Sequence, residues 1–219
     1  WYQIDGVKVP HQPLNPYTRS VEVIISIEKK FIFIANLKTA STSIESELRP
    51  HGDIVVRRSE LGKHLPYAQI QKRFKWLFDV MDEGEFFKFG VIRDPVDYAL
   101  SLYKSHRHEK FKDNPRLYTG DMNFDEFLEK WVPNNKGQLQ PQIDRFIDVD
   151  GNLSVDQLII YSELDKTFPE VMKKLGIPEI TLPRMNVSPD FDVDVSDYAK
   201  SRLETLMERD YKAIADIRT

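Results

Sequence analysis

Short apolar runs alternate with segments of mixed polarity along most of the chain, and this alternation is the main clue to the fold. Two runs, Phe31–Ala35 and Phe86–Ile92, are almost continuously apolar, which is typical of strands buried on both faces of a sheet. Val21–Ile27, Asp53–Val56 and Gln157–Tyr161 are further strand candidates, rich in valine, isoleucine and leucine. The pattern therefore predicts five strands between residues 21 and 161.

Segments with apolar residues three and four apart separate or follow these strands, and that spacing is typical of amphipathic helices. The predicted helices are Ile44–Leu48, Tyr67–Phe78, Pro95–His108, Asn123–Trp131, Leu164–Leu175 and Val195–Ile217. Strands that alternate with helices favour an α/β fold, with a central, mostly parallel sheet flanked by helices on both faces. Ligands bind beyond the carboxyl ends of the strands in such sheets. The loops after Phe31–Ala35 and Phe86–Ile92 are therefore the expected place of a functional site.

The length of 219 residues suits one α/β domain, so we expect a single domain over residues 1–219. Within it, residues 1–20 contain Pro10, Pro13 and Pro16 and are expected to form an irregular N-terminal arm. The chain has no cysteine, which excludes disulfides and thiolate metal sites and fits a reducing compartment.

Charge and hydropathy argue against two classes of partner. The formal net charge is −4, whereas general nucleic-acid binders present a basic surface, so no nucleic-acid partner is expected. No segment reaches the ~18 consecutive apolar residues of a membrane span, and the first residues lack the basic and apolar regions of a signal peptide. We therefore expect a cytoplasmic protein without a membrane span, whose oligomeric state the sequence leaves open.

The loop after Phe31–Ala35 carries residues suited to an anion. It contains Lys38, Thr39, Ala40, Ser41, Thr42 and Ser43. A helix is predicted directly behind it, and a helix N-terminus offers unpaired N–H groups and about half a positive charge. Together these groups favour a bound phosphate or sulfate, although an ordinary Ser/Thr helix cap would use the same residue types. The loop is not a Walker A sequence, because it lacks glycine and its lysine precedes the hydroxyl residues.

A second anion-adapted loop follows Phe86–Ile92. Arg93 comes at the end of this strand, where its guanidinium can bind a phosphate through two hydrogen bonds. Asp94 suits the N-cap and Pro95 the first turn of the next helix, and Ser101 adds a hydroxyl donor two turns later. Either residue alone is better explained by ordinary structural contacts. Two such loops on consecutive strand–helix units instead predict a P-loop-like site for two anionic groups.

The two loops resemble the nucleotide-binding motifs of the PAPS-dependent sulfotransferases. Lys38–Ser43 is similar to the family's 5′-phosphosulfate loop, and Ile92–Pro95 with Ser101 and Tyr103 is similar to its 3′-phosphate motif, in the same order along the chain. The likeness is closest to the carbohydrate sulfotransferases that modify uronic acid 2-hydroxyls. Weaker likenesses follow at Tyr161–Leu164, Leu175–Pro178 and Arg184–Asn186.

The resemblance implies an enzyme that moves a sulfuryl group from PAPS to an acceptor hydroxyl by in-line displacement, releases adenosine 3′,5′-bisphosphate and needs no metal. It assigns the 5′-phosphosulfate to the loop Lys38–Ser43, with Lys38 also catalytic, and the 3′-phosphate to Arg93 and Ser101. It favours a carbohydrate or glycoconjugate acceptor, with a small alcohol or a lipid head group as the alternative.

The resemblance also implies a histidine base. Lys63–Tyr67 is similar to the family segment that carries the catalytic histidine, which makes His64 the predicted general base. The relatives carry a second histidine two positions earlier, where this chain has Gly62, so its acceptor side is expected to differ. Glu45 and Glu47 are rival bases, although ordinary helix-surface charges are the simpler interpretation.

Two other functions stay open at this point. A nucleotide or small-molecule kinase would need Mg²⁺ and an acidic ligand beside the first loop. A non-catalytic nucleotide-binding module would leave His64 without a role. The basic stretch Lys104–Lys110, with His106 and His108, could contact an anionic acceptor, but a solvated helix end is the simpler interpretation.

Overall fold

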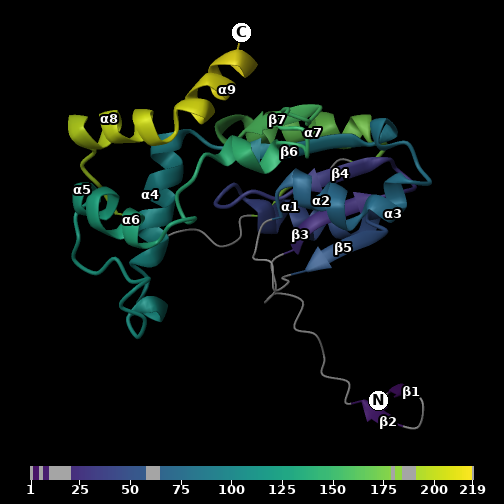
Figure 1. Ribbon diagram of the computed structural model, residues 1–219, viewed down its shortest axis with the longest axis horizontal. Coiled ribbons are helices and arrows are strands. Elements are labelled where there is room, and N and C mark those ends of the chain that lie inside the picture. The colour runs from purple at the N-terminus through teal and green to yellow at the C-terminus, as the bar shows by residue number, and fades with distance from the viewer. Residues whose placement is uncertain are drawn as a thin grey trace.

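A five-stranded sheet in the order β5-β3-β4-β6-β7 forms the centre of the computed structural model (Figure 1). The structure describes residues 2–4, 7–9, 21–57, 65–178, 181–183 and 191–218. The strands are β3 (Val21–Ser26), β4 (Phe31–Ile34), β5 (Ile54–Arg57), β6 (Phe87–Ile92) and β7 (Gln157–Ile160). The five strands expected between residues 21 and 161 are therefore confirmed, with small differences at their ends.

The sheet is mixed. β4, β6 and β7 run parallel, whereas β3 pairs antiparallel with both β4 and β5. The residues Ile27–Lys30 alone join β3 to β4, and a parallel pair needs a much longer crossover connection. The α/β fold is confirmed, and its parallel part is the half of the sheet that carries the two anion loops.

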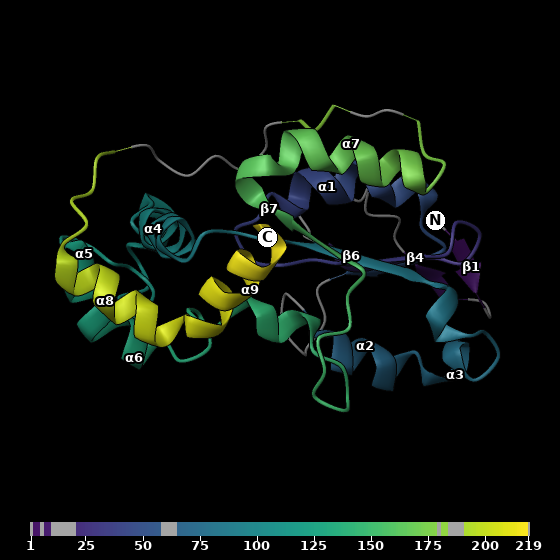
Figure 2. The ribbon, with the colours of Figure 1, turned by 90° about the horizontal axis from the view of Figure 1, so that it is seen from above.

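Helices cover both faces of the sheet. α1 (Ser41–Leu48) and α7 (Leu164–Lys174) lie on one face, and α2 (Tyr67–Arg73) and α3 (Lys75–Phe78) lie on the other (Figure 2). On β4, Phe31 and Phe33 belong to the core under α1 and α7, whereas Ile32 and Ile34 belong to the core under α2. This burial on both sides explains why the strand is continuously apolar.

A second group of helices stands beside the carboxyl ends of the parallel strands (Figures 1 and 2). It consists of α4 (Pro95–His106), α5 (Phe124–Glu126), the π-helical turn η4 (Phe127–Trp131), α6 (Val132–Asn134) and α8 (Asp197–Leu206). The Asp94 side chain accepts hydrogen bonds from the N–H groups of Val96 and Asp97 at 2.9 and 3.3 Å, so the expected N-cap of α4 is confirmed.

The last predicted helix, Val195–Ile217, is wrong as a single element. It divides into α8 and α9 (Glu208–Arg218) at Met207, whose backbone leaves the helical region at φ −122° and ψ 25°. Met207 is fully buried, and the break turns α9 from α8 toward the sheet (Figure 2). A similar break at Phe74 separates α2 from α3.

Residues at the N-terminus form a small sheet of their own, although an irregular arm was expected over residues 1–20. β1 (Tyr2–Ile4) pairs antiparallel with β2 (Val7–Val9). Asp5 and Gly6 stand between the two strands in the sequence, and this dipeptide is strongly favoured in hairpin turns. The rest of that stretch lies outside the described residues.

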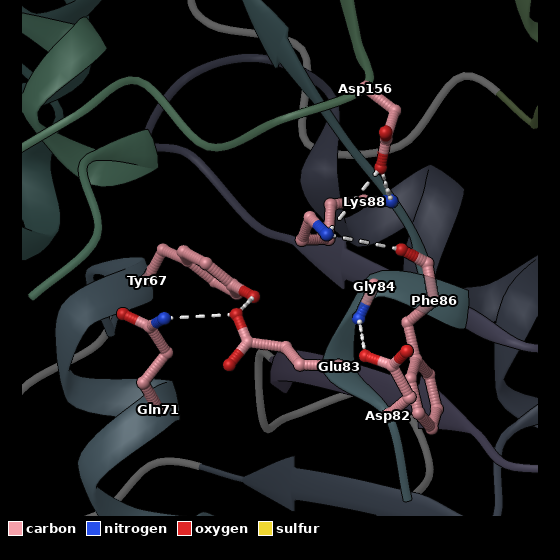
Figure 3. Close-up of polar contacts among 8 residues, drawn as sticks. All are labelled: Tyr67, Gln71, Asp82, Glu83, Gly84, Phe86, Lys88 and Asp156. Atoms are coloured by element: carbon pink, nitrogen blue, oxygen red, sulfur yellow. Dashed lines mark hydrogen bonds and ion pairs between the residues drawn. The ribbon is translucent and has the colours of Figure 1, made fainter. Parts of the chain in front are cut away.

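A polar cluster fixes the start of α2 and of β6 (Figure 3). Tyr67 and Gln71, on α2, both donate hydrogen bonds to the carboxylate of Glu83. The backbone N–H of Lys88 donates to Asp156 Oδ2 at 2.6 Å, which ties β6 to the residue before β7. Residues 65 and 66, which precede α2, therefore lead into a helix that side-chain hydrogen bonds hold in place.

The remaining elements are short 3₁₀ turns. These are η1 (Arg49–His51), η2 (Glu83–Glu85), η3 (Glu109–Phe111), η5 (Gln142–Phe146) and η6 (Tyr161–Glu163). None of the helices in the described ranges is long and apolar enough to cross a bilayer.

Candidate active site

The two anion loops follow neighbouring parallel strands, β4 and β6, and therefore lie side by side at the carboxyl ends of these strands. Asn36 Nδ2 donates to the Val91 carbonyl at 3.3 Å, which joins the ends of the two strands. Arg93 Nη1 donates to the Lys38 carbonyl at 3.4 Å, which joins the loops themselves. The structure thus brings Lys38 and Arg93 into one site.

The first loop has an unusual backbone. Lys38 and Ala40 have positive φ values of 62° and 57°, in the left-handed region that disfavours residues with a side chain. Asn36 holds the turn, because its Oδ1 accepts from the Leu37 N–H at 2.8 Å and its carbonyl accepts from Thr39 Oγ1 at 3.0 Å. Left-handed residues of this kind form the concave N–H nests that bind anions.

The N-terminus of α1 faces this loop without a side-chain cap. Its N-cap residue is Ala40, and no side chain among the described residues accepts a hydrogen bond as its cap. The interpretation of the loop as an ordinary Ser/Thr cap is therefore wrong. Ser41 and Ser43 are buried and Thr42 is half-buried, so hydroxyl and N–H donors gather at the positive end of the helix dipole.

The electrostatic environment of Lys38 favours an anion. Burial, the Arg93 guanidinium and Lys110 together lower the pKa of Lys38 from 10.5 to about 8, with burial as the largest cause. Lys110 belongs to η3, an element that the sequence did not connect with the loops. A ligand that carries negative charge would therefore stabilise the protonated form of Lys38 beside these two cations.

The Arg93 side chain is supported on one side and has an unused donor. Its Cζ lies 4.4 Å from the centre of the Tyr161 ring, which follows β7. Its Nε is buried and has no hydrogen-bond partner among the described residues. A buried guanidinium N–H without a partner is costly, and a phosphate oxygen would satisfy it.

The other predicted residues near the second loop lie on α4. Ser101 is buried, and Tyr103 donates a hydrogen bond to the Met122 carbonyl at 2.6 Å within the helical group. The prediction that His106 belongs to a solvated helix end is wrong. Its side chain is buried, stacks on Phe111 with ring centres 4.6 Å apart, and its Nδ1 lies 3.0 Å from the Leu117 carbonyl.

The candidate bases are His64 and two glutamates of α1, Glu45 and Glu47. His64 and the weaker motif Arg184–Asn186 lie outside the described residues. Glu45 is 1% exposed, so it is not the surface charge that the simpler interpretation assumed, whereas Glu47 is half-buried.

A cleft adjoins both loops. Its walls comprise Asn36, Pro66, Tyr98, Gly137, Gln140, Pro141, Gln142, Asp144 and Arg145. Asn36 precedes Lys38 by two residues, and Gln142 forms hydrogen bonds with the Arg93 backbone at 3.0 and 2.8 Å. Neither Gln142 nor the buried Asp210 that accepts its hydrogen bonds belongs to a motif that is visible in the sequence.

Two anion loops at the carboxyl ends of adjacent parallel strands define an α/β protein with a P-loop-like nucleotide site. The chain matches the model of the sulfotransferase family over residues 21–213, and it belongs to that family. The prediction of a PAPS-dependent sulfotransferase is thereby confirmed, in preference to a kinase.

A similar solved structure is the mouse sulfotransferase SULT7A1 complexed with PAP. It is 18% identical in sequence, with a TM-score of 0.40, over 86% of this chain and 67% of the mouse chain. No curated protein sequence matches the chain at a significant level.

Proposed function

We propose that the protein transfers a sulfuryl group from PAPS to a hydroxyl of a carbohydrate or glycoconjugate and releases adenosine 3′,5′-bisphosphate. The observation that carries this proposal is the meeting of Lys38 and Arg93, where Arg93 Nη1 lies 3.4 Å from the Lys38 carbonyl. Two cationic loops at the carboxyl ends of adjacent strands suit a ligand with anionic groups at both ends of one nucleoside.

The donor's two ends have different partners. The loop Lys38–Ser43 receives the 5′-phosphosulfate, because it combines a lysine, hydroxyl groups and the uncapped N-terminus of α1. Arg93 and Ser101 receive the 3′-phosphate, and the unpartnered Nε of Arg93 supports this assignment.

The reaction is an in-line displacement at sulfur. The acceptor oxygen forms a bond to sulfur while the bond from sulfur to the bridging phosphate oxygen breaks, and the acceptor proton passes to a base. Lys38 neutralises the charge that grows on the bridging oxygen, and with a pKa of about 8 it is mostly protonated at neutral pH. Removing one such preorganised donor typically costs ~3–4 kcal/mol of transition-state stabilisation, or at least ~100-fold in rate.

The cleft beside the loops supplies the acceptor site. The exposed amide of Gln140 and the charged side chains of Asp144 and Arg145 suit an acceptor with many hydroxyl groups more than a flat apolar one. Pro66 is part of the cleft wall and follows His64 by two residues, which supports His64 as the general base. Buried Glu45 is the second candidate base.

Sulfate transfer tests the reaction and its base. With ³⁵S-labelled PAPS and a panel of uronate-containing polysaccharides, neutral polysaccharides and simple alcohols, we expect labelling of a polysaccharide. His64→Ala should lower the rate by about 10²–10⁴-fold, whereas His51→Ala, a matched change on η1, should leave it unchanged. A full rate in His64→Ala with a large loss in Glu45→Gln would assign the base to Glu45 instead.

Calorimetry tests the donor. Adenosine 3′,5′-bisphosphate should bind without added metal, and ATP with Mg²⁺ should bind far more weakly. The reverse preference would refute the assignment of the two loops to a 3′,5′-substituted nucleotide.

A further inference from the structure

The backbone of Arg93 is held by the side chain of a residue far along the chain. The Arg93 N–H donates to Gln142 Oε1 at 3.0 Å, and Gln142 Nε2 donates to the Arg93 carbonyl at 2.8 Å. The carboxamide thus pairs with both backbone groups of Arg93, as a neighbouring strand would do. β6 ends at Ile92, so this pairing extends the fixed geometry of the sheet by one residue, to the residue that carries the guanidinium.

A buried carboxylate holds Gln142 in turn. Asp210 Oδ2 accepts from the Gln142 N–H at 2.9 Å and from Gln142 Nε2 at 3.2 Å, and its Oδ1 accepts from the Ile143 N–H at 2.9 Å. Asp210 is 0% and Gln142 is 1% exposed. Burying a carboxylate costs free energy unless hydrogen bonds satisfy it. These three donors therefore compensate for the burial of Asp210.

Both residues stand on elements that the core fixes. Phe146, at the end of η5, is fully buried against Gly90 of β6, where an added Cβ would lie 2.3 Å from Phe146 Cε1. Asp210 reaches η5 only because the break at Met207 turns α9 toward the sheet. The sheet and the last helix therefore fix Gln142 from two sides.

We propose that Gln142 and Asp210, together the Gln142–Asp210 bracket, are positioning residues that set the Arg93 guanidinium for the nucleotide's 3′-phosphate. This inference rests on the proposed function, since it concerns the same site. The hydrogen bonds from the bracket to Arg93 reach its backbone, while the Tyr161 ring and the Lys38 carbonyl contact its side chain. In this arrangement both bracket residues act on the site through the Arg93 backbone, so they are positioning and not catalytic residues.

The first test removes the carboxamide. Gln142→Ala should raise the Kd of adenosine 3′,5′-bisphosphate about tenfold, the effect of losing a hydrogen-bonded support for a charged contact. The Kd of adenosine 5′-monophosphate, which lacks the 3′-phosphate, should change less than about twofold. Gln69→Ala, on α2, is the matched control and should change neither value. An equal loss for both nucleotides, or no loss for either, overturns the inference.

A double-mutant cycle with Arg93→Ala separates positioning from simple loss of stability. Once Arg93 is gone, Gln142→Ala should have almost no further effect on the Kd of the bisphosphate, because the two changes act through one contact. In the enzyme, Gln142→Ala should raise KM for PAPS about tenfold and lower kcat by less than about threefold. Additive losses in Kd, or a lower kcat at unchanged KM, would assign the residue a merely structural role.

Asp210→Asn provides a second route if Gln142→Ala fails to fold. It keeps the side-chain shape but turns an amide N–H₂ toward a donor, and it should raise the Kd of the bisphosphate about threefold to tenfold. Asp216→Asn, on the exposed side of the same helix, is its control. A wild-type protein that binds no bisphosphate overturns the proposed function as well, whereas normal wild-type binding that neither bracket variant weakens overturns this inference alone.

Discussion

Replacing Lys38 with methionine should stabilise the ligand-free protein, although it removes a residue assigned to the active site. The pKa of Lys38 is lowered from 10.5 to about 8, chiefly by burial. At pH 7 the lysine is charged in both the folded and the unfolded chain, and the folded state carries the cost of burying that charge. Methionine has a similar shape and no charge, so the cost disappears.

The magnitude follows from the change in pKa. Lowering a pKa from 10.5 to about 8 corresponds to about 3 kcal/mol of folding free energy at pH 7. Lys38 is only partly buried, so we expect about 2–3 kcal/mol in practice, or about 5–10 °C in Tm for a chain of this size. As pH rises through 8 the folded protein releases the proton, and the difference between variant and wild type should vanish near pH 10.5.

Urea unfolding at pH 7 and pH 10 measures this effect. Lys30→Met is the matched control, because Lys30 also has a positive φ, of 53°, and is half-buried, but its ammonium pairs with Glu85, 3.0 Å from its Nζ. We expect the control to change stability by less than about 1 kcal/mol. If Lys38→Met is no more stable than wild type at pH 7, or if its advantage persists unchanged at pH 10, the reasoning about the buried charge is refuted.

Three further predictions concern the site and its frame. Because an anionic ligand favours protonated Lys38, the affinity for adenosine 3′,5′-bisphosphate should fall above pH 8 by up to about tenfold per pH unit. Calorimetry from pH 7 to 9.5 would measure this decline, and Lys38→Arg should remove it. Gly90→Ala should lower the free energy of unfolding in urea by about 2–3 kcal/mol, because the new Cβ would lie 2.3 Å from Phe146 Cε1 and 2.9 Å from the Ile34 carbonyl. An unchanged urea midpoint would contradict the close packing of η5 on β6. Asp94→Ala should cost about 1 kcal/mol through loss of the α4 cap, and Asp94→Asn clearly less; equal losses in the two would argue against capping as the cause.

The strands were predictable because the core requires apolar side chains on both faces of β4 and β6, and such runs are visible without knowledge of the partner. The break at Met207 was not predictable. Apolar residues continue at helical spacing through the break. The chain turns there because Met207 packs in the core and because Asp210 accepts a hydrogen bond from Gln142 of η5. A local pattern cannot carry that tertiary requirement.

The anion loops were predictable for a different reason. A lysine and hydroxyl groups before a helix, or an arginine at the end of a strand, form a site through local geometry, so the residue types stand close together in sequence. His106 misled the interpretation because basic neighbours surround it in sequence, whereas Phe111 and Trp131 surround it in space. Its burial depends on a loop that returns to α4, which no local spacing indicates.

Gln142 lies 49 residues after Arg93, and Asp210 lies a further 68 residues along the chain. A glutamine before an isoleucine has no special meaning by itself. The chemistry of the bracket nevertheless has a reason. A carboxylate at position 142 could not donate to the Arg93 carbonyl and would be repelled by the buried carboxylate of Asp210, and a cation there would add to the repulsion that Lys38 already experiences. A neutral carboxamide fixes the Arg93 backbone without altering the charge of the site, and Gln142 stands between the negative charge of Asp210 and Arg93. The arginine is thereby held in place and its charge remains available to the ligand.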